Sequence, residues 1–412
     1  MSRYLVLLAI FLIPAYIFRF LVFGLPTNVF EITVGIALLV FIIERLLVGS
    51  RLRGNDKRLL VGFWPNYLLV FFAAVSIIFS PDKTTALGIW KGWFFVPAIL
   101  YFLIINNYKK NNIRRIAIPI FINLLIVSLW ATLQKLGVIS TLFYQTNDPG
   151  FYDYLARFRS FGPFESPNYL AMYVVPAGIF SFTIFDYFQK KIDRTLILIM
   201  FLLPLYALYT SKSLGGLLAF GFGLLSFLAF GMAKTYKAKM VDSGKKIALW
   251  IIGLIVTAVV LAFVFSSIGN DTYSNNIRMD IYRYAAQLIK ANPVFGIGMG
   301  QFQSAVASIS TSNSGFVTYG LSYALHPHNL YLAFWLNIGI LGLLSFIYIL
   351  GSFFWNLGRR GGEIFLMAGA FASMVAIMIH GLVDTTYFKN DLSALFWLLL
   401  ATGSVIGRRQ DA

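Results

Sequence analysis

The sequence predicts an all-α polytopic membrane protein with about twelve transmembrane helices. Of its 412 residues, 59% are hydrophobic and only 12% are charged, whereas a soluble domain has roughly twice that charged fraction. Apolar runs of about 20 residues recur along the chain, which is the length that a helix needs to cross a ~30 Å hydrocarbon core. These runs are unbroken instead of alternating, so the pattern excludes a β-barrel.

The expected spans follow these runs in order. The first, Tyr4–Phe23, is longer than the core of a secretory signal, contains Arg19 and lacks a small-residue cleavage pattern, so we interpret it as a retained span. A short turn, Ser211–Ser213, separates the seventh span from the eighth. The spans after the first are Val29–Val48, Leu59–Ser80, Ala86–Ile105, Ile116–Ile139, Tyr169–Phe188, Thr195–Thr210, Leu214–Ala233, Ile247–Ser266, Leu330–Trp355, Ile364–Val383 and Leu392–Ile406.

The distribution of cationic residues predicts the orientation of these spans. Most of the 33 Lys and Arg residues lie in alternate connections, and the positive-inside rule assigns those connections and both termini to the cytoplasm. Topology therefore accounts for the net charge of +17 without nucleic acid. We expect one integral membrane domain, residues 1–412, with long extracytoplasmic loops at 140–168 and 267–329, the second of which carries the active site. The absence of cysteine excludes disulfides and thiolate metal ligands.

Several ionisable residues lie at the outer face in this topology. Arginines on the side that the positive-inside rule disfavours indicate an anionic ligand, because a planar guanidinium binds two phosphate oxygens at once. The alternative is that single arginines are solvated or pair with loop aspartates. The residues concerned are His326, His328, His380, Arg157, Arg159, Arg278 and Arg283.

The second long loop contains a predicted surface helix, Asn276–Ala291. Ile277, Ile281, Tyr284 and Leu288 form an apolar stripe along it at helical spacing. Asn292-Pro293 ends the helix, and glycines follow at 296, 298 and 300. These glycines follow a helix instead of a strand and lack a Gly-Lys-Ser/Thr ending, so we expect tight turns beside the membrane and no nucleotide site.

The histidines are the expected chemical groups. His326 and His328 share a face if the chain is extended, and Asp384 can join them in a metal site, but no further His or Cys completes a set. A histidine at a helix mouth is suited to accept a proton from a hydroxyl or to bind phosphate, although His328 can instead be a helix cap. His380 and Asp384, four residues apart, share a helix face, where the carboxylate either orients the imidazole or forms a local structural pair.

These residues resemble a known family. His328-Asn329, nine residues, Gly339, two residues and Gly342 resemble the motif of bacterial O-antigen ligases and the related polymerases. Further stretches are similar to segments of that family in the expected order, between Arg159 and Trp397. They are Arg159–Phe164 with Pro167-Asn168, Ser211–Gly216, and Arg278–Phe302.

The resemblance implies a glycosyltransferase that uses glycan linked to undecaprenyl diphosphate, at the outer face of the bacterial inner membrane. It implies a catalytic role for His328, and diphosphate binding by Arg159, Arg278 and Lys212. It also implies that no metal or other cofactor is needed. Supporting roles fall to Asn329, His326, Arg283, His380 and Asp384. The chain departs from the family pattern at Asn337, where an acidic residue is common, and at Lys212, where arginine is frequent.

Two kinds of acceptor are compatible with the resemblance. A ligase attaches the glycan to a lipid A-core sugar, whereas a polymerase extends a growing lipid-linked glycan, and the long loop directly before His328 favours the ligase. We expect a single displacement with inversion at the sugar carbon. A polysaccharide or lipid transporter is the alternative of another class, but transporters concentrate ionisable residues near mid-membrane, and here they gather at the outer face.

Overall fold

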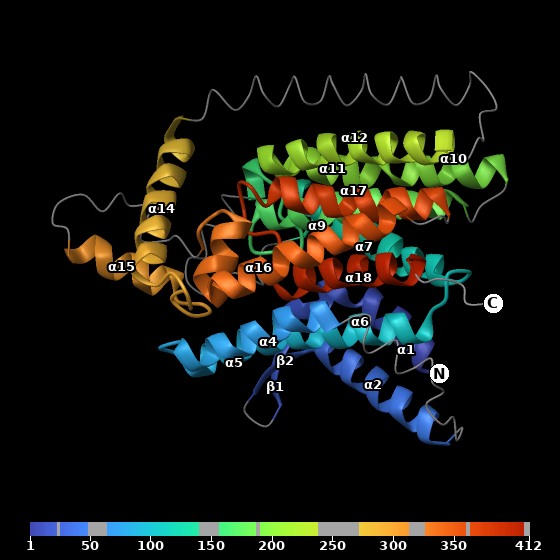
Figure 1. The fold of residues 1–412 in the computed structure, drawn as a ribbon. Coiled ribbons are helices and arrows are strands. Elements are labelled where there is room, and N and C mark those ends of the chain that lie inside the picture. The colour runs from blue at the N-terminus through green and yellow to red at the C-terminus, as the bar shows by residue number, and fades with distance from the viewer. Residues whose placement is uncertain are drawn as a thin grey trace.

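The protein is described by a computed structural model, which covers residues 1–22, 25–47, 64–139, 156–186, 190–237, 272–312, 326–359 and 363–407. In this part of the chain nearly every element is a helix, and most of the helices run side by side as one bundle (Figure 1). The all-α polytopic class is therefore confirmed. The expected span Ile247–Ser266 and the loop residues 140–155, 267–271 and 313–325 lie outside the described residues.

The N-terminal segment differs from the single span Tyr4–Phe23 that the sequence predicts. Helix α1 (Ser2–Phe11) ends early, and a 3-10 turn, η1 (Ile13–Ile17), follows because Pro14 has no N–H to continue the helix. A two-stranded antiparallel hairpin, β1 (Arg19–Val22) and β2 (Leu25–Asn28), then reverses the chain. Arg19 consequently stands outside any span, with 58% of its side chain exposed.

The remaining helices correspond to the expected spans that fall in the described residues. Within the described residues, six stretches are long and apolar enough to cross a membrane, and four shorter apolar helices accompany them. The helices before the second long loop are α2 (Val29–Leu47), α4 (Trp64–Phe79), α5 (Lys83–Trp90), η2 (Lys91–Phe95), α6 (Val96–Asn107), η3 (Ile113–Ile116), α7 (Ala117–Lys135), α9 (Pro167–Ser181), η5 (Phe182–Asp186), α10 (Lys191–Met200), α11 (Leu202–Ser211) and α12 (Leu214–Lys237). Those after it are α14 (Thr272–Ala291), α15 (Phe302–Ser312), α16 (Leu330–Arg359), α17 (Ile364–His380) and α18 (Asn390–Ile406).

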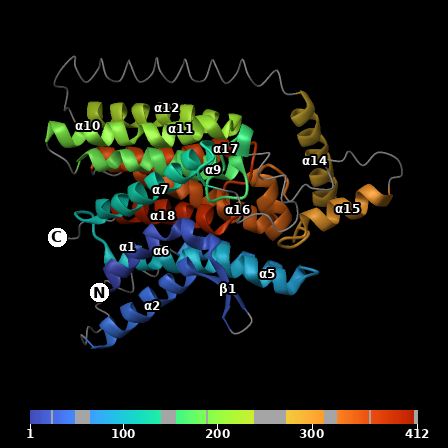
Figure 2. The same cartoon turned by 180° about the vertical axis from the view of Figure 1, so that it is seen from behind.

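Helix α18 lies at the centre of the bundle. Its residues are buried almost throughout, and it packs on α6, α16 and α17. A helix that is apolar all round is buried on all sides, which is what the sequence of α18 dictates. Helix α17 in turn packs along α12. Helices α7, α9 and α11 pack against one another on the side of the bundle that Figure 2 views.

Helices α14 and α15 lie at one end of the bundle, and the start of α1 and the end of α18 lie at the other (Figure 1). The predicted amphipathic helix is confirmed as α14, which begins four residues earlier than expected. Ile281, Ala285 and Leu288 on its apolar face are buried in a cluster with Leu336 of α16. Helix α14 therefore covers one end of the bundle.

The connection after α14 is inserted into a break in α16. Gly339 has φ 75° and ψ −179° inside α16, and the N–H of Ile340 donates to the carbonyl of Val294 at 3.1 Å. A Cβ on Gly339 would lie 2.1 Å from that carbonyl oxygen. Gly296 also has positive φ, and its neighbour Ile297 donates to the carbonyl of Leu336 at 2.8 Å. The glycines thus allow the tight backbone approach that the sequence predicts.

Candidate active site

Asn329 begins α16 and fixes the segment before it. Its Oδ1 accepts hydrogen bonds from the backbone N–H groups of Tyr331 and Leu332, both at 3.0 Å, which is the pattern of an N-cap. Its Nδ2 donates to the carbonyl of Leu382 at 2.9 Å, in the connection between α17 and α18. The capping role that the sequence left open for His328 therefore belongs to Asn329.

His328 has an unusual backbone conformation. Its φ is +44°, in the left-handed region that costs a non-glycine residue roughly 1–2 kcal/mol. The hydroxyl of Tyr282, on α14, donates to the His328 carbonyl at 3.0 Å and supports this conformation. Strained residues of this kind concentrate at functional sites because the surrounding structure must hold them. His328 is therefore held by both α14 and α16.

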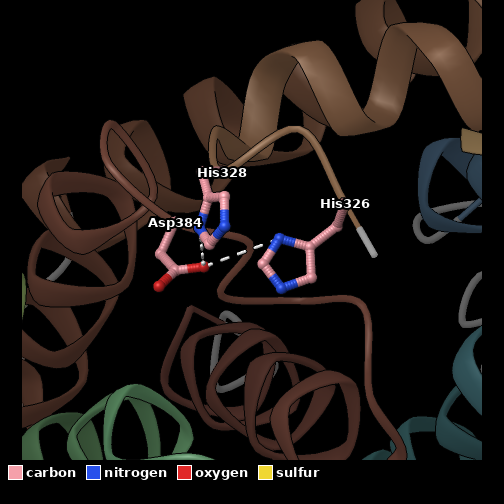
Figure 3. Close-up of side chains that lie close together, drawn as sticks. All are labelled: His326, His328 and Asp384. Carbon is pink, nitrogen blue, oxygen red and sulfur yellow. Dashed lines mark ion pairs between the residues drawn. The ribbon is translucent and has the colours of Figure 1, made fainter. Parts of the chain in front are cut away.

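Both imidazoles face one carboxylate (Figure 3). Nδ1 of His328 lies 3.4 Å from Oδ1 of Asp384, and Nδ1 of His326 lies 3.8 Å from the same oxygen. The two rings meet edge to face with centroids 4.4 Å apart. Asp384 is buried, and its oxygens accept from the N–H of Thr385 at 2.9 Å and from Nδ2 of Asn168 at 3.0 Å. The structure thus brings together three residues from two separate connections.

Burial and the neighbouring charges determine the protonation states of Asp384 and His326. Burial raises the pKa of the Asp384 carboxyl, but its interactions with His328, His326 and His380 outweigh burial and hold the pKa below its usual range. Burial lowers the pKa of His326 to about 4, with a further contribution from His328 that the carboxylate of Asp384 partly offsets. At neutral pH the site therefore contains an ionised Asp384 and a neutral His326.

This arrangement supports two kinds of chemistry. A neutral imidazole whose Nδ1 faces a carboxylate presents its other nitrogen as a proton acceptor. One ligand atom from each of His326, His328 and Asp384 also lies within 4.8 Å of the others, so the three can act as a set of metal ligands. The further hydrogen bonds to Asp384 would orient its carboxylate in either case.

The Arg159 side chain is linked to this cluster through hydrogen bonds within the protein. Its Nε donates to the carbonyl of Ser211 at 2.7 Å and its Nη2 to Oδ1 of Asn168 at 2.9 Å. Because Asn168 also donates to Asp384, one hydrogen-bonded chain joins Arg159, Asn168 and Asp384. The structure therefore brings Arg159 to the site, and Asn168 lies between it and the carboxylate.

Lys212 and His380 lie on the α11–α12 side. Lys212 is exposed and takes a left-handed conformation, φ 49°, that separates α11 from α12 as the sequence predicts. His380 is buried, and a Cβ on Gly215 would lie 2.9 Å from its ring. The Asp384 N–H donates to the His380 carbonyl at 3.0 Å, while the Asp384 side chain pairs with His326 and His328. The sequence suggested that Asp384 orients His380, whereas its carboxylate faces His326 and His328.

The two arginines of α14 differ in their surroundings. Arg283 pairs with Asp280 at 2.8 Å and its side chain is 73% exposed, which is the solvated alternative considered for single arginines. Arg278 is half-buried and precedes Tyr282 by one helical turn, so it shares the face that contacts His328. Burial raises the pKa of Tyr282, and the charge of Arg278 opposes that rise. Arg278 is thus the arginine of α14 nearest to the site.

The comparison with known proteins finds a family that part of the chain resembles. Residues 199–347 match the O-antigen ligase family. The resemblance is confirmed for this segment, which contains Lys212, Arg278, both clustered histidines and the Asn329 cap. Asp384 and Arg159 lie outside the matched segment, Arg159 in the residues before α9 and Asp384 in the α17–α18 connection.

Two curated relatives are distant. A protein of Rickettsia typhi (strain ATCC VR-144 / Wilmington) named "Putative polysaccharide ligase" is 22% identical over 375 residues, 84% of this chain and 83% of the relative. A protein of the same description from Rickettsia bellii (strain RML369-C) is 25% identical over 215 residues, 49% of this chain and 50% of the relative. The chain is thus similar along most of its length to one protein described as a putative polysaccharide ligase, and over about half of its length to a second.

Beside His326 and His328 lies a group of charged residues that the sequence did not predict. Lys389 donates to Glu165 at 2.8 Å, and Arg19 lies 3.6 Å from the same carboxylate. The sequence also predicted no role for Asn168, although Pro167-Asn168 is part of the resemblance to the O-antigen ligase family. The only available signal was position, since Glu165 and Asn168 both follow Arg159 in a stretch similar to the family.

Proposed function

We propose that the chain is a glycosyltransferase of the O-antigen ligase type, which moves glycan from undecaprenyl diphosphate to an acceptor hydroxyl. The observation that carries this proposal is the convergence of His326 and His328 on the buried carboxylate of Asp384, beside the arginine-bearing helix α14. The match of residues 199–347 to the O-antigen ligase family supports it. The coarser statement, a ligase-like role for this membrane protein, is supported by the family match and by the two curated relatives.

The donor already carries a good leaving group. As the bond between sugar and diphosphate breaks, negative charge grows on the phosphate oxygens, and fixed cations that offset this charge supply the largest part of such catalysis. Arg278 and the exposed Lys212 are assigned to this role, with Arg159 in support behind Asn168. Guanidinium groups suit the role because each binds two phosphate oxygens.

His328 is the proposed base for the acceptor hydroxyl. Asp384 faces its Nδ1, so it stabilises the tautomer that leaves the other ring nitrogen free to take the proton. General-base assistance of this kind is worth about 10²–10⁴ in rate. The acceptor oxygen then displaces the diphosphate in one step, with inversion at the sugar carbon. Asn329, His326, His380 and Asp384 support this arrangement, which uses no metal.

The proposed site faces the outside of the bacterial inner membrane, with both termini in the cytoplasm. The start of α1 and the end of α18 lie at the end of the bundle opposite α14 and α15, in agreement with this orientation (Figure 1). The pair of Arg114 and Glu363, at the start of α17, also lies away from the histidines. Cationic residues at that end follow the positive-inside rule.

The acceptor is proposed to be a lipid A-core sugar, with a growing lipid-linked glycan as the alternative. The direct experiment incubates purified protein in lipid with undecaprenyl-diphosphate-linked glycan, with or without lipid A-core, and with or without EDTA. Product that forms only with the core indicates a ligase, and longer lipid-linked chains without it indicate a polymerase. Loss of transfer in EDTA, restored by a divalent cation, would instead assign His326, His328 and Asp384 as metal ligands. A protein that moves the lipid without forming a glycosidic bond is a transporter.

A further inference from the structure

A cavity of about 250 Å³ lies beside His326. Its walls come from β1, η2, the segment before α9 and the start of α9, the start of α15, the start of α16 with the residues before it, and the segment before α18. The aromatic residues in the wall are Trp93, Tyr169, Phe302 and Phe388, and the charged residues are Arg19, Glu165 and Lys389. None of these residues belongs to the groups assigned to the diphosphate or to the base.

The charges of the cavity are paired with one another. Glu165 lies between Lys389, at 2.8 Å, and Arg19, at 3.6 Å. Burial raises the pKa of Glu165, but Lys389 and Arg19 outweigh burial and keep the pKa below its usual range. Lys389 is buried and its Nζ also lies 3.9 Å from the centre of the Tyr169 ring. Cations that are neutralised in this way make a poor site for a diphosphate, which needs uncompensated positive charge.

Other polar groups of the wall are used to hold it together. Asn337 accepts from the N–H of Gly300 at 3.0 Å and donates to the carbonyl of Ala333 at 2.8 Å. Asn390 accepts from Nε1 of Trp93 at 3.2 Å and donates to Glu31 at 3.0 Å. The groups that remain for a ligand are therefore the Glu165 carboxylate, the half-exposed Arg19 and the imidazole of His326.

The cavity therefore combines flat apolar surfaces with rigid hydrogen-bonding groups and little uncompensated charge. A prenyl chain could form no hydrogen bond with Glu165, Arg19 or His326, so it would not use the polar part of the wall. A pyranose ring presents apolar C–H faces to aromatic rings and hydroxyls at its edge, and so satisfies both kinds of wall. The volume is below the ~300–1,000 Å³ of ordinary ligand pockets, which limits the ligand to about one ring.

We propose that this cavity is a subsite for a single sugar ring of the glycan substrates, held between the aromatic wall and the pair of Glu165 and Lys389, with a hydroxyl against His326. This inference rests on the proposed function, since it names where one of the reacting glycans binds. The ring comes either from the sugar next to the diphosphate of the donor or from the end of the acceptor. Both sources have the same chemistry, and a binding experiment separates them.

The experiment measures binding of methyl glycosides of glucose, galactose, mannose, N-acetylglucosamine and glucuronic acid to the full-length protein by ligand-detected NMR. We expect at least one to bind, and Glu165→Gln and Lys389→Met each to weaken that binding about tenfold or more, because each removes a charge-assisted hydrogen bond. Glu363→Gln is the matched control, since it makes the same change in a paired carboxylate at the start of α17, and it should bind as the wild type does. Glu165→Gln keeps the shape of the side chain, so it remains informative if Lys389→Met fails to fold.

A second arm finds the source of the ring. If the ring belongs to the donor, undecaprenyl-diphosphate-linked glycan displaces the glycoside, whereas sugar-free undecaprenyl diphosphate does not. If it belongs to the acceptor, the glycoside and the lipid-linked glycan bind together. Absence of binding by every glycoside, or equal binding by Glu165→Gln and Glu363→Gln, would overturn the subsite. Wild-type protein that transfers glycan but binds no glycoside would leave the proposed function intact, so the two failures are distinguishable.

Discussion

Nδ1 of His328 lies 3.4 Å from Oδ1 of Asp384, although the two residues are separated by two helices of the bundle. The pair exists because Asn329 caps α16 and at the same time binds the carbonyl of Leu382, two residues before Asp384. The cap therefore joins the segment that carries the histidines to the segment that carries the carboxylate. The predictions below follow from this connection and from the elements that support it.

Asp384→Asn should lower the rate of glycan transfer by about 10²–10⁴ while affinity for the lipid-linked donor stays within a few-fold of wild type. The amide keeps the shape of the carboxylate but no longer stabilises the proton on Nδ1 of His328. Asn168→Leu should have a smaller effect, since Asp384 keeps its bond from the Thr385 N–H. Steady-state rates with donor binding measured in parallel check this, and wild-type turnover by Asp384→Asn would refute it.

The resistance of the protein to heat should fall as the pH is lowered from about 6.5 to about 4. His326 is buried in its neutral form with a pKa of about 4, whereas in the unfolded chain it titrates near 6.5. Between these values the unfolded state binds more protons, so acid favours unfolding. Asp384 contributes to acid unfolding only below its own ordinary pKa. Thermal unfolding of wild type and His326→Gln checks this, and an unchanged pH dependence in the variant would contradict it.

Arg278→Ala should raise the KM for the lipid-linked donor about tenfold or more, because a charge-assisted contact to phosphate from the half-buried Arg278 is worth more than one from an exposed side chain. Arg283→Ala is the matched control on the same helix. Its side chain is 73% exposed and already pairs with Asp280, so we expect less than a twofold change. Donor titrations measure both variants, and equal effects of the two would remove Arg278 from the site.

Gly339→Ala should destabilise the protein by at least about 1–3 kcal/mol, since alanine is strained at φ 75° and its Cβ would collide with the Val294 carbonyl. Gly351→Ala, in the same helix, is the control, because a Cβ there meets nothing within 4 Å. Thermal unfolding in detergent compares the two. Equal stability of the two variants would show that the break in α16 is not a structural requirement.

Local patterns in the sequence predicted much of this fold. The apolar runs gave the spans, and the stripe from Ile277 to Leu288 gave α14, since both depend on the helical period alone. The span Tyr4–Phe23 was wrong because average hydropathy does not detect the early end of α1 before Pro14 or the hairpin that follows. The break at Gly339 depends on Val294, 45 positions earlier, and no local pattern contains that contact.

The sequence predicted the members of the candidate site better than their partners. Spacing singled out His328, and the topology brought Arg159 and Arg278 to the same end of the bundle. The helical interval between His380 and Asp384 suggested a pair, but α17 ends at His380, and the next turn directs the carboxylate to His326 and His328. The contribution of Asn168 required the packing of α9 against that turn, which only the folded chain provides.

The most direct test of the account is glycan transfer by His328→Ala, measured with purified protein and undecaprenyl-diphosphate-linked glycan, together with binding of the same donor. The account predicts that transfer falls by at least about 10² while the donor still binds, because the imidazole acts on the acceptor hydroxyl and the cations hold the diphosphate. Transfer by His328→Ala at the wild-type rate would contradict the central role of this histidine.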